Sequence, residues 1–344
     1  MPQRSNGTNA KRVNLALQGG GAHGAFTWGV LDALIADGRL EFEGISGASA
    51  GAMNAVAVAQ GWLDGGRDGA REALERFWGR VAAHQALMPL RNAPWEQAIW
   101  GHDLTYSLAY QGFENFVRTF SPYQFNPLDW NPLRQVIQET MDFDRLRAAS
   151  PHKLFISATD VATGKARVFT ERELSVEVLT ASACLPFLFQ APTIDGKRYW
   201  DGGYSGNPPL WPLFETCTPE DIILVEINPI NRAELPTSAP DILNRLNEIG
   251  MTTALRGEMR AIAFVQRLRD EGRVDAARYR RLHVHAIHDE EAMVAYNVST
   301  KFNADLGFLR ELKALGEAAA RGWLADHFVD VGVRDSVDIR ARYL

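Results

Sequence analysis

The spacing of hydrophobic residues changes along the N-terminal part of the chain. Residues 13–17 form a short apolar run that ends in Gln18 and three glycines, which predicts a buried strand followed by a loop. Large apolar residues then recur at helical intervals over 24–37, and Gly38 follows as a C-cap. We therefore expect a strand, a loop and a helix in this order.

The same order is repeated in the next segment. A short apolar run at 42–46 predicts a second strand, and the alanine-rich residues 50–60 predict a helix that ends at Gly61. Two strands joined through a helix lie parallel and next to each other in a sheet, because such a crossover is right-handed. The pattern therefore favours an α/β fold.

Strands and helices continue to alternate further along the chain. Apolar runs predict strands at 153–158, 166–169, 198–200, 222–227 and 282–287, and helical spacing predicts helices over 243–269 and most of 302–328. No internal repeat or low-complexity linker marks a domain boundary. We expect a disordered tail at 1–11 and a single domain over 12–344, with a core at 13–230 and a mainly helical C-terminal extension at 240–344.

Aromatic residues are concentrated in one stretch, well above the 10% average of the chain. They are Trp95, Trp100, Tyr106, Tyr110, Phe113, Phe116, Phe120, Tyr123, Phe125 and Trp130. One interpretation is a helical excursion that packs onto the sheet. The other is a cap that lines an apolar ligand groove, since such sites need a continuous apolar wall.

Composition and charge restrict the class of protein. The chain has 344 residues, 46% of them hydrophobic, and a net charge of −6, which argues against nucleic acid as a partner. Residues 1–12 lack the apolar segment of a signal peptide, and no apolar run is long enough to span a bilayer. We expect a cytoplasmic protein, with weak peripheral contact to a membrane left open. Cys184 and Cys217 have neither disulfide nor metal spacing and are expected to be buried.

A candidate nucleophile lies between the second predicted strand and the helix after it. The segment Gly47-Ala48-Ser49-Ala50-Gly51 matches G-x-S-x-G, in which the serine occupies a strained turn from strand to helix. Small neighbours are needed because bulky ones would clash with the crossing backbone. The pattern alone is common, but its position between a strand and a helix indicates that Ser49 is a nucleophile.

A glycine-rich loop occupies the equivalent position after the first predicted strand. Its sequence is Gly19-Gly20-Gly21-Ala22-His23-Gly24. Backbone N–H groups of such a loop, together with the N-terminus of the next helix, can bind a developing oxyanion. Gly19 and Ser49 are one strand–helix–strand unit apart, so both loops are expected at the carboxyl edge of adjacent parallel strands.

The same loop also fits a dinucleotide-binding fingerprint, with glycines at 19, 21 and 24. That fingerprint needs an acidic residue at the carboxyl end of the second strand. Ser46 is found there instead, and Glu41 and Glu43 fall at or before the start of the strand. Nucleotide binding is therefore disfavoured.

The serine needs a general base, and two kinds of residue are candidates. His283, His285 and His288 lie downstream in the order found in α/β-hydrolases, although in that fold the elbow follows more strands than it does here. Alternation places His283 and His285 on one face of a strand, which a solvated face would explain, and we expect a structural role for all three histidines. The alternative of a serine–acid–histidine triad stays open.

Asp201 is the better candidate on position. It follows the predicted strand 198–200, and Gly202 and Gly203 allow a sharp turn beside it. Asp195 reads as part of a hairpin turn, and Asp160 as the start of a turn after a strand.

These segments resemble the patatin-like phospholipases. The resemblance rests on GGGAHG, GASAG and ASACLPFLFQAPTIDGKRYWDGGYSGNPPL, which occur in this order over more than half of the chain. It implies a three-layer α/β/α fold with a mainly parallel central sheet, and a dyad of Ser49 and Asp201 without a catalytic histidine. The oxyanion hole is implied at Gly19, Gly20, Gly21, Ala22 and Ala50, and the motifs are supported by His23, Gly24, Gly47, Gly51, Gly202 and Gly203.

The implied reaction is two-step acyl transfer on a lipid or another ester, with no metal or organic cofactor. The aromatic stretch would then line the site of the acyl chain. The family often carries arginine or lysine where this chain has His23, so binding of a phospholipid phosphate is expected to be weaker here. A catalytically inactive lipid-binding protein is the remaining alternative.

Overall fold

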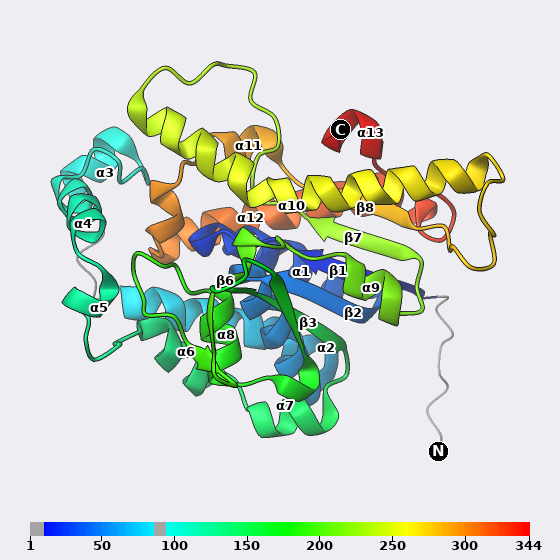
Figure 1. Ribbon diagram of the computed structural model, residues 1–344, viewed down its shortest axis with the longest axis horizontal. Helices are drawn as coiled ribbons and strands as arrows, with labels where there is room; N and C mark the ends of the chain where they lie inside the picture. The colour runs from blue at the N-terminus through cyan, green and yellow to red at the C-terminus, as the bar shows by residue number, and fades with distance from the viewer. Residues whose placement is uncertain (1–9, 86–93) are drawn as a thin grey trace.

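A computed structural model describes residues 10–85 and 94–344 (Figure 1). Eight strands of this described part form one sheet in the order β5-β6-β3-β2-β1-β7-β8, with β4 paired to β3. The strands are β1 (Lys11–Leu17), β2 (Leu40–Ala48), β3 (Lys153–Asp160), β4 (Ala166–Thr170), β5 (Thr193–Ile194), β6 (Lys197–Asp201), β7 (Asp221–Val225) and β8 (His283–Ile287). The neighbours from β3 through β8 pair in parallel, and β4, β5 and β6 pair antiparallel. The expected mainly parallel sheet is confirmed.

Helices cover both faces of the sheet. They are α1 (Gly24–Asp37), α2 (Ala50–Gln85), α3 (Pro94–Trp100), α4 (Leu108–Thr119), α5 (Pro122–Phe125), α6 (Pro132–Thr140), α7 (Phe143–Ala149), α8 (Val176–Ser182), α9 (Trp211–Thr216), α10 (Ala239–Asp270), α11 (Glu290–Val294), α12 (Leu306–His327) and α13 (Ile339–Tyr343). Short 3-10 turns are η1 (Gly21–His23), η2 (Glu171–Glu173), η3 (Gly202–Tyr204), η4 (Ser299–Phe302) and η5 (Phe328–Asp330). None of the helices in the described part of the chain combines the length and apolar character needed to cross a membrane.

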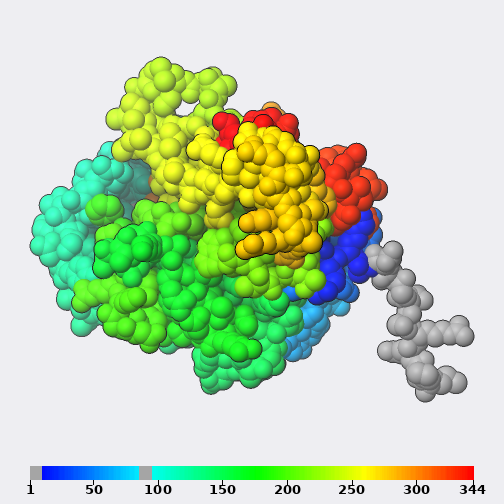
Figure 2. Space-filling view, turned by 45° about the vertical axis from the view of Figure 1, so that its right-hand side comes forward, coloured from blue at the N-terminus to red at the C-terminus, as the bar shows by residue number. Residues whose placement is uncertain are grey.

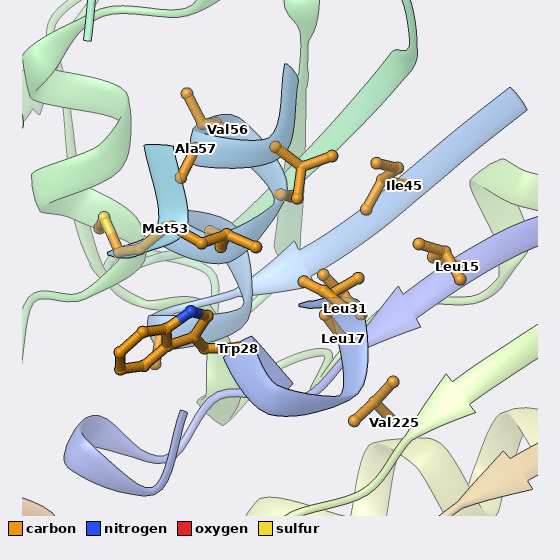
Figure 3. Close-up of a cluster of buried hydrophobic side chains, with 14 of the residues drawn as sticks. Leu15, Leu17, Trp28, Leu31, Ile45, Met53, Val56, Ala57 and Val225 are labelled. Carbon is orange, nitrogen blue, oxygen red and sulfur yellow. The ribbon is translucent and has the colours of Figure 1, made fainter. Parts of the chain in front are cut away.

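Alternate residues of the central strands build two separate cores. Leu15 and Leu17 of β1 face a core made with α1, α2 and α12, and part of this core is drawn in Figure 3 with Trp28 and Met53. Ala16 faces the opposite core, which is made with α9, α10 and α13. Side chains alternate between the faces of a strand, so one apolar run supplies both cores. The result is the three-layer α/β/α arrangement.

The N-terminal elements agree closely with the sequence pattern. Helix α1 has the expected bounds, and Gly38 ends it in the left-handed conformation with a φ of 80°. The expected end of the second helix at Gly61 is wrong, because α2 continues to Gln85 across non-helical residues Gly65 and Gly66. Gly61 instead allows a close backbone approach, since a Cβ there would lie 2.2 Å from the carbonyl oxygen of Gly69.

The expected tail at 1–11 falls mostly on residues 1–9, which lie outside the described residues, and Lys11 already belongs to β1. The C-terminal residues are integrated into the layers. Strand β8 extends the sheet, α10 covers one face and α12 packs on α1, where a Cβ at Gly29 would lie 1.9 Å from the carbonyl oxygen of Lys313.

The aromatic stretch is helical, as one interpretation expected, but most of it does not pack onto the sheet. Helices α6 and α7 contribute Val136, Ile137 and Leu146 to the core, whereas α3 to α5 leave most of their aromatic side chains on the surface. Tyr110 is an exception and is buried. The exposed members are Trp95, Tyr106, Phe116, Phe120, Tyr123 and Trp130.

Candidate active site

Ser49 lies in the turn between β2 and α2, with a φ of 52°. This is the left-handed region, which non-glycine residues rarely adopt, and its strain projects the side chain away from the end of the strand. The two glycines of the motif are required by space. A Cβ at Gly47 would lie 2.6 Å from the carbonyl carbon of Gly51, and a Cβ at Gly51 would lie 2.1 Å from the carbonyl oxygen of Leu17.

The glycine-rich loop lies directly against this turn. Strands β1 and β2 are parallel neighbours, and Leu17 pairs with Gly47 in their register. A Cβ at Gly19 would lie 2.5 Å from the carbonyl oxygen of Ala48 and 2.8 Å from the Cβ of Ser49. The contact that the topology predicted between the two loops is therefore present.

The loop is held from both sides by two asparagines. Asn207 accepts a hydrogen bond from the Gly19 N–H at 2.6 Å, and its amide nitrogen donates to the Gly19 carbonyl at 3.3 Å. Asn228 donates to the same carbonyl at 2.9 Å. Because its N–H is engaged, Gly19 shapes the loop and does not offer a donor to substrate, contrary to the sequence expectation. Neither asparagine was identified from the sequence.

The donors that remain are Gly20, Gly21, Ala22 and Ala50. Gly20 is the N-cap of the turn η1, Gly21 and Ala22 begin that turn, and Ala50 is the first residue of α2, so their N–H groups precede the hydrogen-bonded part of each helix. The N–H of Ser49 is engaged by the hydroxyl of Ser182 at 3.0 Å. The first turns of two helices thus meet beside Ser49.

Asp201 ends β6, where Ala158 of β3 is its antiparallel neighbour. The side chain is 3% exposed, and its Oδ1 accepts a hydrogen bond from the Gly203 N–H at 2.7 Å. Burial raises the pKa of Asp201 to about 6, against the opposing effects of the Gly203 N–H, a hydrogen bond with the Ser49 hydroxyl, and the charge of Lys301. The structure thus brings Ser49 and Asp201 together.

Backbone contacts hold Asp201 in this position. Its carbonyl accepts a hydrogen bond from the Thr159 hydroxyl at 2.8 Å, and its N–H donates to the carbonyl of Cys184 at 2.8 Å. Gly202 is required because a Cβ there would lie 2.2 Å from the carbonyl oxygen of Ser157. Gly202 therefore serves close packing against β3.

The two other aspartates considered from the sequence have the turn roles expected of them. Asp160 ends β3, and its Oδ1 accepts hydrogen bonds from the N–H groups of Ala162 and Thr163 at 3.0 Å. Asp195 has a φ of 50° in the hairpin between β5 and β6. Both predictions are confirmed.

The histidines of β8 are buried, so the expectation of a solvated face is wrong. His285 is fully buried, and its Nε2 lies 3.0 Å from Oδ1 of Asp221, the first residue of β7. This pair belongs to the amino end of the parallel strands, whereas Ser49 follows the carboxyl end of β2. His283 is also buried on β8, and His288 lies beside Arg342. His285 therefore has a structural role.

His23 is buried too, and it does not face a substrate. Its Nε2 lies 2.7 Å from the hydroxyl of Thr300, and its ring packs near Tyr296 and Phe308. Burial and the charge of Lys301 lower the pKa of His23 well below its usual value. His23 is therefore neutral and cannot bind a phosphate by charge.

A positive charge reaches the loop from Lys301 in η4, which the sequence analysis missed. The Lys301 ammonium donates to Oδ1 of Asn228 and Oδ1 of Asn247, both at 2.9 Å. Burial lowers the pKa of Lys301 to about 8, against the attraction of Glu248 and Asp201. Its backbone also touches the loop, since a Cβ at Gly21 would lie 2.4 Å from the Lys301 carbonyl oxygen.

Among residues 10–85 and 94–344, no three His, Cys, Asp or Glu side chains are grouped so that they could hold a metal ion. Cys184 and Cys217 are buried free thiols, as expected. Burial raises the pKa of Cys184 to about 12, so its thiol is neutral beside Asp201.

Comparisons with known proteins place this site in a family. One similar solved structure is VipD from Legionella pneumophila, with 17% identity over 88% of this chain and 67% of that chain and a TM-score of 0.38. Another contains the heterodimeric ExoU–SpcU complex of the type III secretion system of Pseudomonas aeruginosa, with 18% identity over 71% of this chain and a TM-score of 0.31. This chain spans about half (51%) of the length of the latter. No curated protein matches. The family model for patatin-like phospholipase matches residues 15–214, more than half of the chain, which therefore belongs to the patatin-like phospholipase family.

Proposed function

We propose that this chain is a serine lipid acyl hydrolase that cleaves carboxylic esters, with Ser49 as nucleophile and Asp201 as general base. The proposal is carried by the position of the Ser49 hydroxyl, which lies close enough to the buried Asp201 carboxylate to lower its pKa, while burial raises that pKa to about 6. A base with this pKa is ionised at neutral pH and is a stronger proton acceptor than an ordinary carboxylate. Membership of the family supports an ester hydrolase in general, and the dyad supplies a mechanism.

In the first step Asp201 removes the proton of Ser49 as its oxygen attacks the ester carbonyl. The strained backbone of Ser49 keeps the hydroxyl at the end of β2, so the nucleophile is already oriented before substrate binds. The alcohol leaves with the proton held by Asp201, and an acyl-enzyme forms on Ser49. Asp201 then activates a water molecule that releases the acid.

The negative oxygen of the tetrahedral intermediate would be bound by N–H groups of Gly20, Gly21, Ala22 and Ala50. Fixed donors of this kind stabilise charge that develops in the transition state, because they need no reorganisation when it appears. Asn207 and Asn228 keep the loop in place through Gly19. Lys301 holds Asn228, and its charge favours the ionised form of Asp201.

The environment of the histidines favours this dyad over a serine–acid–histidine triad. His285 is paired with Asp221 at the amino end of the sheet. The buried, neutral state of His23 also supports a preference in substrate. We expect neutral esters to be hydrolysed at least as well as phospholipids, and a strong preference for anionic phospholipids would contradict this.

The test is hydrolysis of a short p-nitrophenyl ester by Ser49→Ala and Asp201→Asn, with Asp160→Asn and Asp195→Asn as matched controls. We expect losses on the order of 10³–10⁴-fold in kcat for the first two, as for members of a catalytic triad. The controls lie in turns and should keep most of the activity. A fluorophosphonate probe should label Ser49, and labelling at another residue or an active Ser49→Ala variant would refute the proposal. Vesicle binding without turnover in the wild type would instead indicate a lipid-binding protein.

A further inference from the structure

The first half of α10 exposes apolar side chains and buries polar ones, the reverse of an ordinary surface helix. Its exposed face carries Ile242, Leu246 and Ile249, which follow each other at helical spacing on one side. Its buried face over the same turns carries Asn244, Glu248 and Thr252. In the second half the order is the usual one, with Leu255, Met259 and Ile262 buried. The inversion is therefore confined to the first turns of this long helix.

The buried polar face is fully paired, so this orientation is specific. Glu248 accepts hydrogen bonds from Arg232 at 2.7 Å and from Arg245 at 3.1 Å. Asn244 accepts one from the Val298 N–H at 2.9 Å and donates to Glu248 at 3.1 Å. A helix rotated to bury its apolar face would leave these groups without partners, which costs more than exposing a few apolar side chains. The outward apolar face is thus fixed by the structure.

That face carries almost no charge. Between residues 239 and 253 the exposed positions include a single charged residue, Asp241, which lies in the first turn and accepts a hydrogen bond from the Ser238 hydroxyl. Two of the apolar side chains are about half exposed, Leu246 at 59% and Ile249 at 47%, and Leu235 in the preceding loop is 84% exposed. Such a surface matches a partner that is apolar and electrically neutral.

A second apolar surface lies next to it on α3 to α5. Figures 1 and 2 both place α3 and α4 on the same side of the molecule as the first half of α10. Segment 297–301 connects the two: Val298 donates to Asn244, the Ser299 hydroxyl accepts from the Leu104 N–H, and Asn297 donates to Thr105. The exposed residues of this second surface are Trp95, Ile99, Tyr106, Leu108, Phe116, Phe120, Tyr123, Leu128 and Trp130.

The chemistry of this second surface is that of a lipid interface. Tryptophan and tyrosine are enriched where a protein meets the headgroups of a membrane, because each ring has an apolar body and a polar tip. Leu128 protrudes with 91% exposure. Over residues 94–131 the only lysine or arginine is Arg118, which is paired with Glu114 at 2.8 Å. With a net charge of −6 on the whole chain, anionic lipid would be repelled.

The α10 surface borders the proposed catalytic centre. Met251 of α10 lies against the turn after Asp201, where a Cβ at Gly203 would be 2.9 Å from its sulfur. The Met251 carbonyl accepts a hydrogen bond from Asn207, which also holds Gly19. The apolar stripe of α10 therefore ends at Ile249, two residues before Met251, which contacts Gly203 after Asp201 and Asn207 beside the glycine-rich loop.

We propose that the first half of α10, together with α3 to α5, is a docking surface for an electrically neutral lipid interface, such as a phosphatidylcholine bilayer. The purpose of this surface, which is to bring lipid esters to Ser49, rests on the proposed ester hydrolase activity. The docking itself is a property of the surface and is measurable without turnover.

The test compares Leu246→Gln/Ile249→Gln with the matched control Val329→Gln/Val333→Gln, in which two similarly exposed apolar residues far along the chain are changed. Binding to phosphatidylcholine vesicles is measured by flotation in the Ser49→Ala background, so that hydrolysis does not alter the vesicles. We expect the α10 variant to bind about tenfold more weakly, because two apolar side chains no longer leave water, and the control to bind like the parent. Thermal unfolding verifies that both variants are folded.

A second readout uses the active enzyme. The ratio of hydrolysis of a micellar ester to that of a monomeric ester should fall about tenfold in the α10 variant, in line with its weaker binding. Equal binding by both variants, or tighter binding to phosphatidylglycerol vesicles, would overturn the proposal. So would light scattering that reveals a dimer dissociated by the α10 variant, since the face would then contact a second copy. Vesicle binding by a wild type that hydrolyses no ester would refute the proposed function and leave the docking surface standing.

Discussion

Replacing Asp201 by asparagine should abolish ester hydrolysis and make the protein more stable at pH 8. The two side chains have nearly the same shape, and the amide oxygen of asparagine can still accept the hydrogen bond from the Gly203 N–H. What disappears is a negative charge at a site that is 3% exposed. A general base is thus expected to be held at a cost to the stability of the fold.

The size of this cost follows from the pKa of Asp201, which burial raises from 3.8 to about 6. A difference of about two pH units corresponds to about 3 kcal/mol between the charged and neutral forms. Because the pKa is higher in the folded state, protonation of Asp201 stabilises the fold. This stabilisation is complete below the pKa of Asp201 in the unfolded chain, and it is lost as the pH rises through about 6. At pH 8 the charged residue therefore destabilises the wild type by up to about 3 kcal/mol.

The assay is urea unfolding of wild type and Asp201→Asn at pH 8 and pH 5, together with kcat for a short p-nitrophenyl ester. At pH 8 the variant should be more stable by up to about 3 kcal/mol, and at pH 5 the difference should fall to about half, because the wild type has by then bound most of its proton. Asp160→Asn is the control, since Asp160 caps a turn through its Oδ1.

Two results would refute this reasoning. If Asp201→Asn is less stable than the wild type at pH 8, the carboxylate is not held in an unfavourable charged state. If the stability difference does not change between pH 8 and pH 5, its origin is packing and not ionisation. Retained activity in a folded variant would remove Asp201 from the mechanism altogether.

Three further predictions concern neighbouring residues. The kcat/KM of the wild type should fall as the pH drops through about 6, where Asp201 becomes protonated. In Lys301→Met this fall should begin at a pH higher by less than about one unit, and Lys301→Arg should restore its position. An unchanged pH dependence in Lys301→Met would mean that Lys301 does not act on Asp201. Gly19→Ala should lower kcat/KM by at least about a hundredfold, because its Cβ would collide with the nucleophile turn, and near-normal activity would show that the loop can relax. His285→Gln should leave kcat within about tenfold. It should lower the free energy of unfolding by about 1–3 kcal/mol, because the contact with Asp221 is lost. A collapse of kcat at an unchanged free energy of unfolding would favour a triad.

Most of the sheet and its crossover helices could be predicted because local spacing determines them. Helix α1 begins and ends where the periodicity and Gly38 indicated, and the parallel contact of β1 with β2 follows from the handedness of the crossover. Gly61 was misread because a glycine ends a helix only where the backbone turns, and here it serves a close contact inside α2. The expectation that the aromatic stretch packs onto the sheet was wrong for most of its side chains, because composition alone does not tell which face of a helix is buried. Its role in lining a ligand groove stays a prediction.

The proposed nucleophile and base could be selected from the sequence because each lies at the end of a strand with small neighbours required by space. Ser49 and Asp201 have such signatures in the sequence. Asn207, Asn228 and Lys301 do not, since each comes from a different segment and reaches the loop only through the tertiary fold. A single asparagine or lysine has no pattern to distinguish it from a surface residue. What the sequence could not supply is therefore the set of side chains that hold the catalytic loop in place.

The position of Lys301 also changes how His23 should be understood. By resemblance to the family, His23 stands where an arginine or lysine is often found, and it was expected to weaken the binding of a charged headgroup. In the structure His23 points into the protein toward Thr300, while Lys301 of the same short turn donates to Asn228, which holds Gly19 of the glycine-rich loop. Two adjacent residues of η4 thus help to hold the loop, one through a neutral ring and one through a charge. A charged residue at position 23 would lie close to the Lys301 ammonium in a buried site, and their repulsion would be costly. The neutral histidine is therefore a consequence of where this chain places its positive charge.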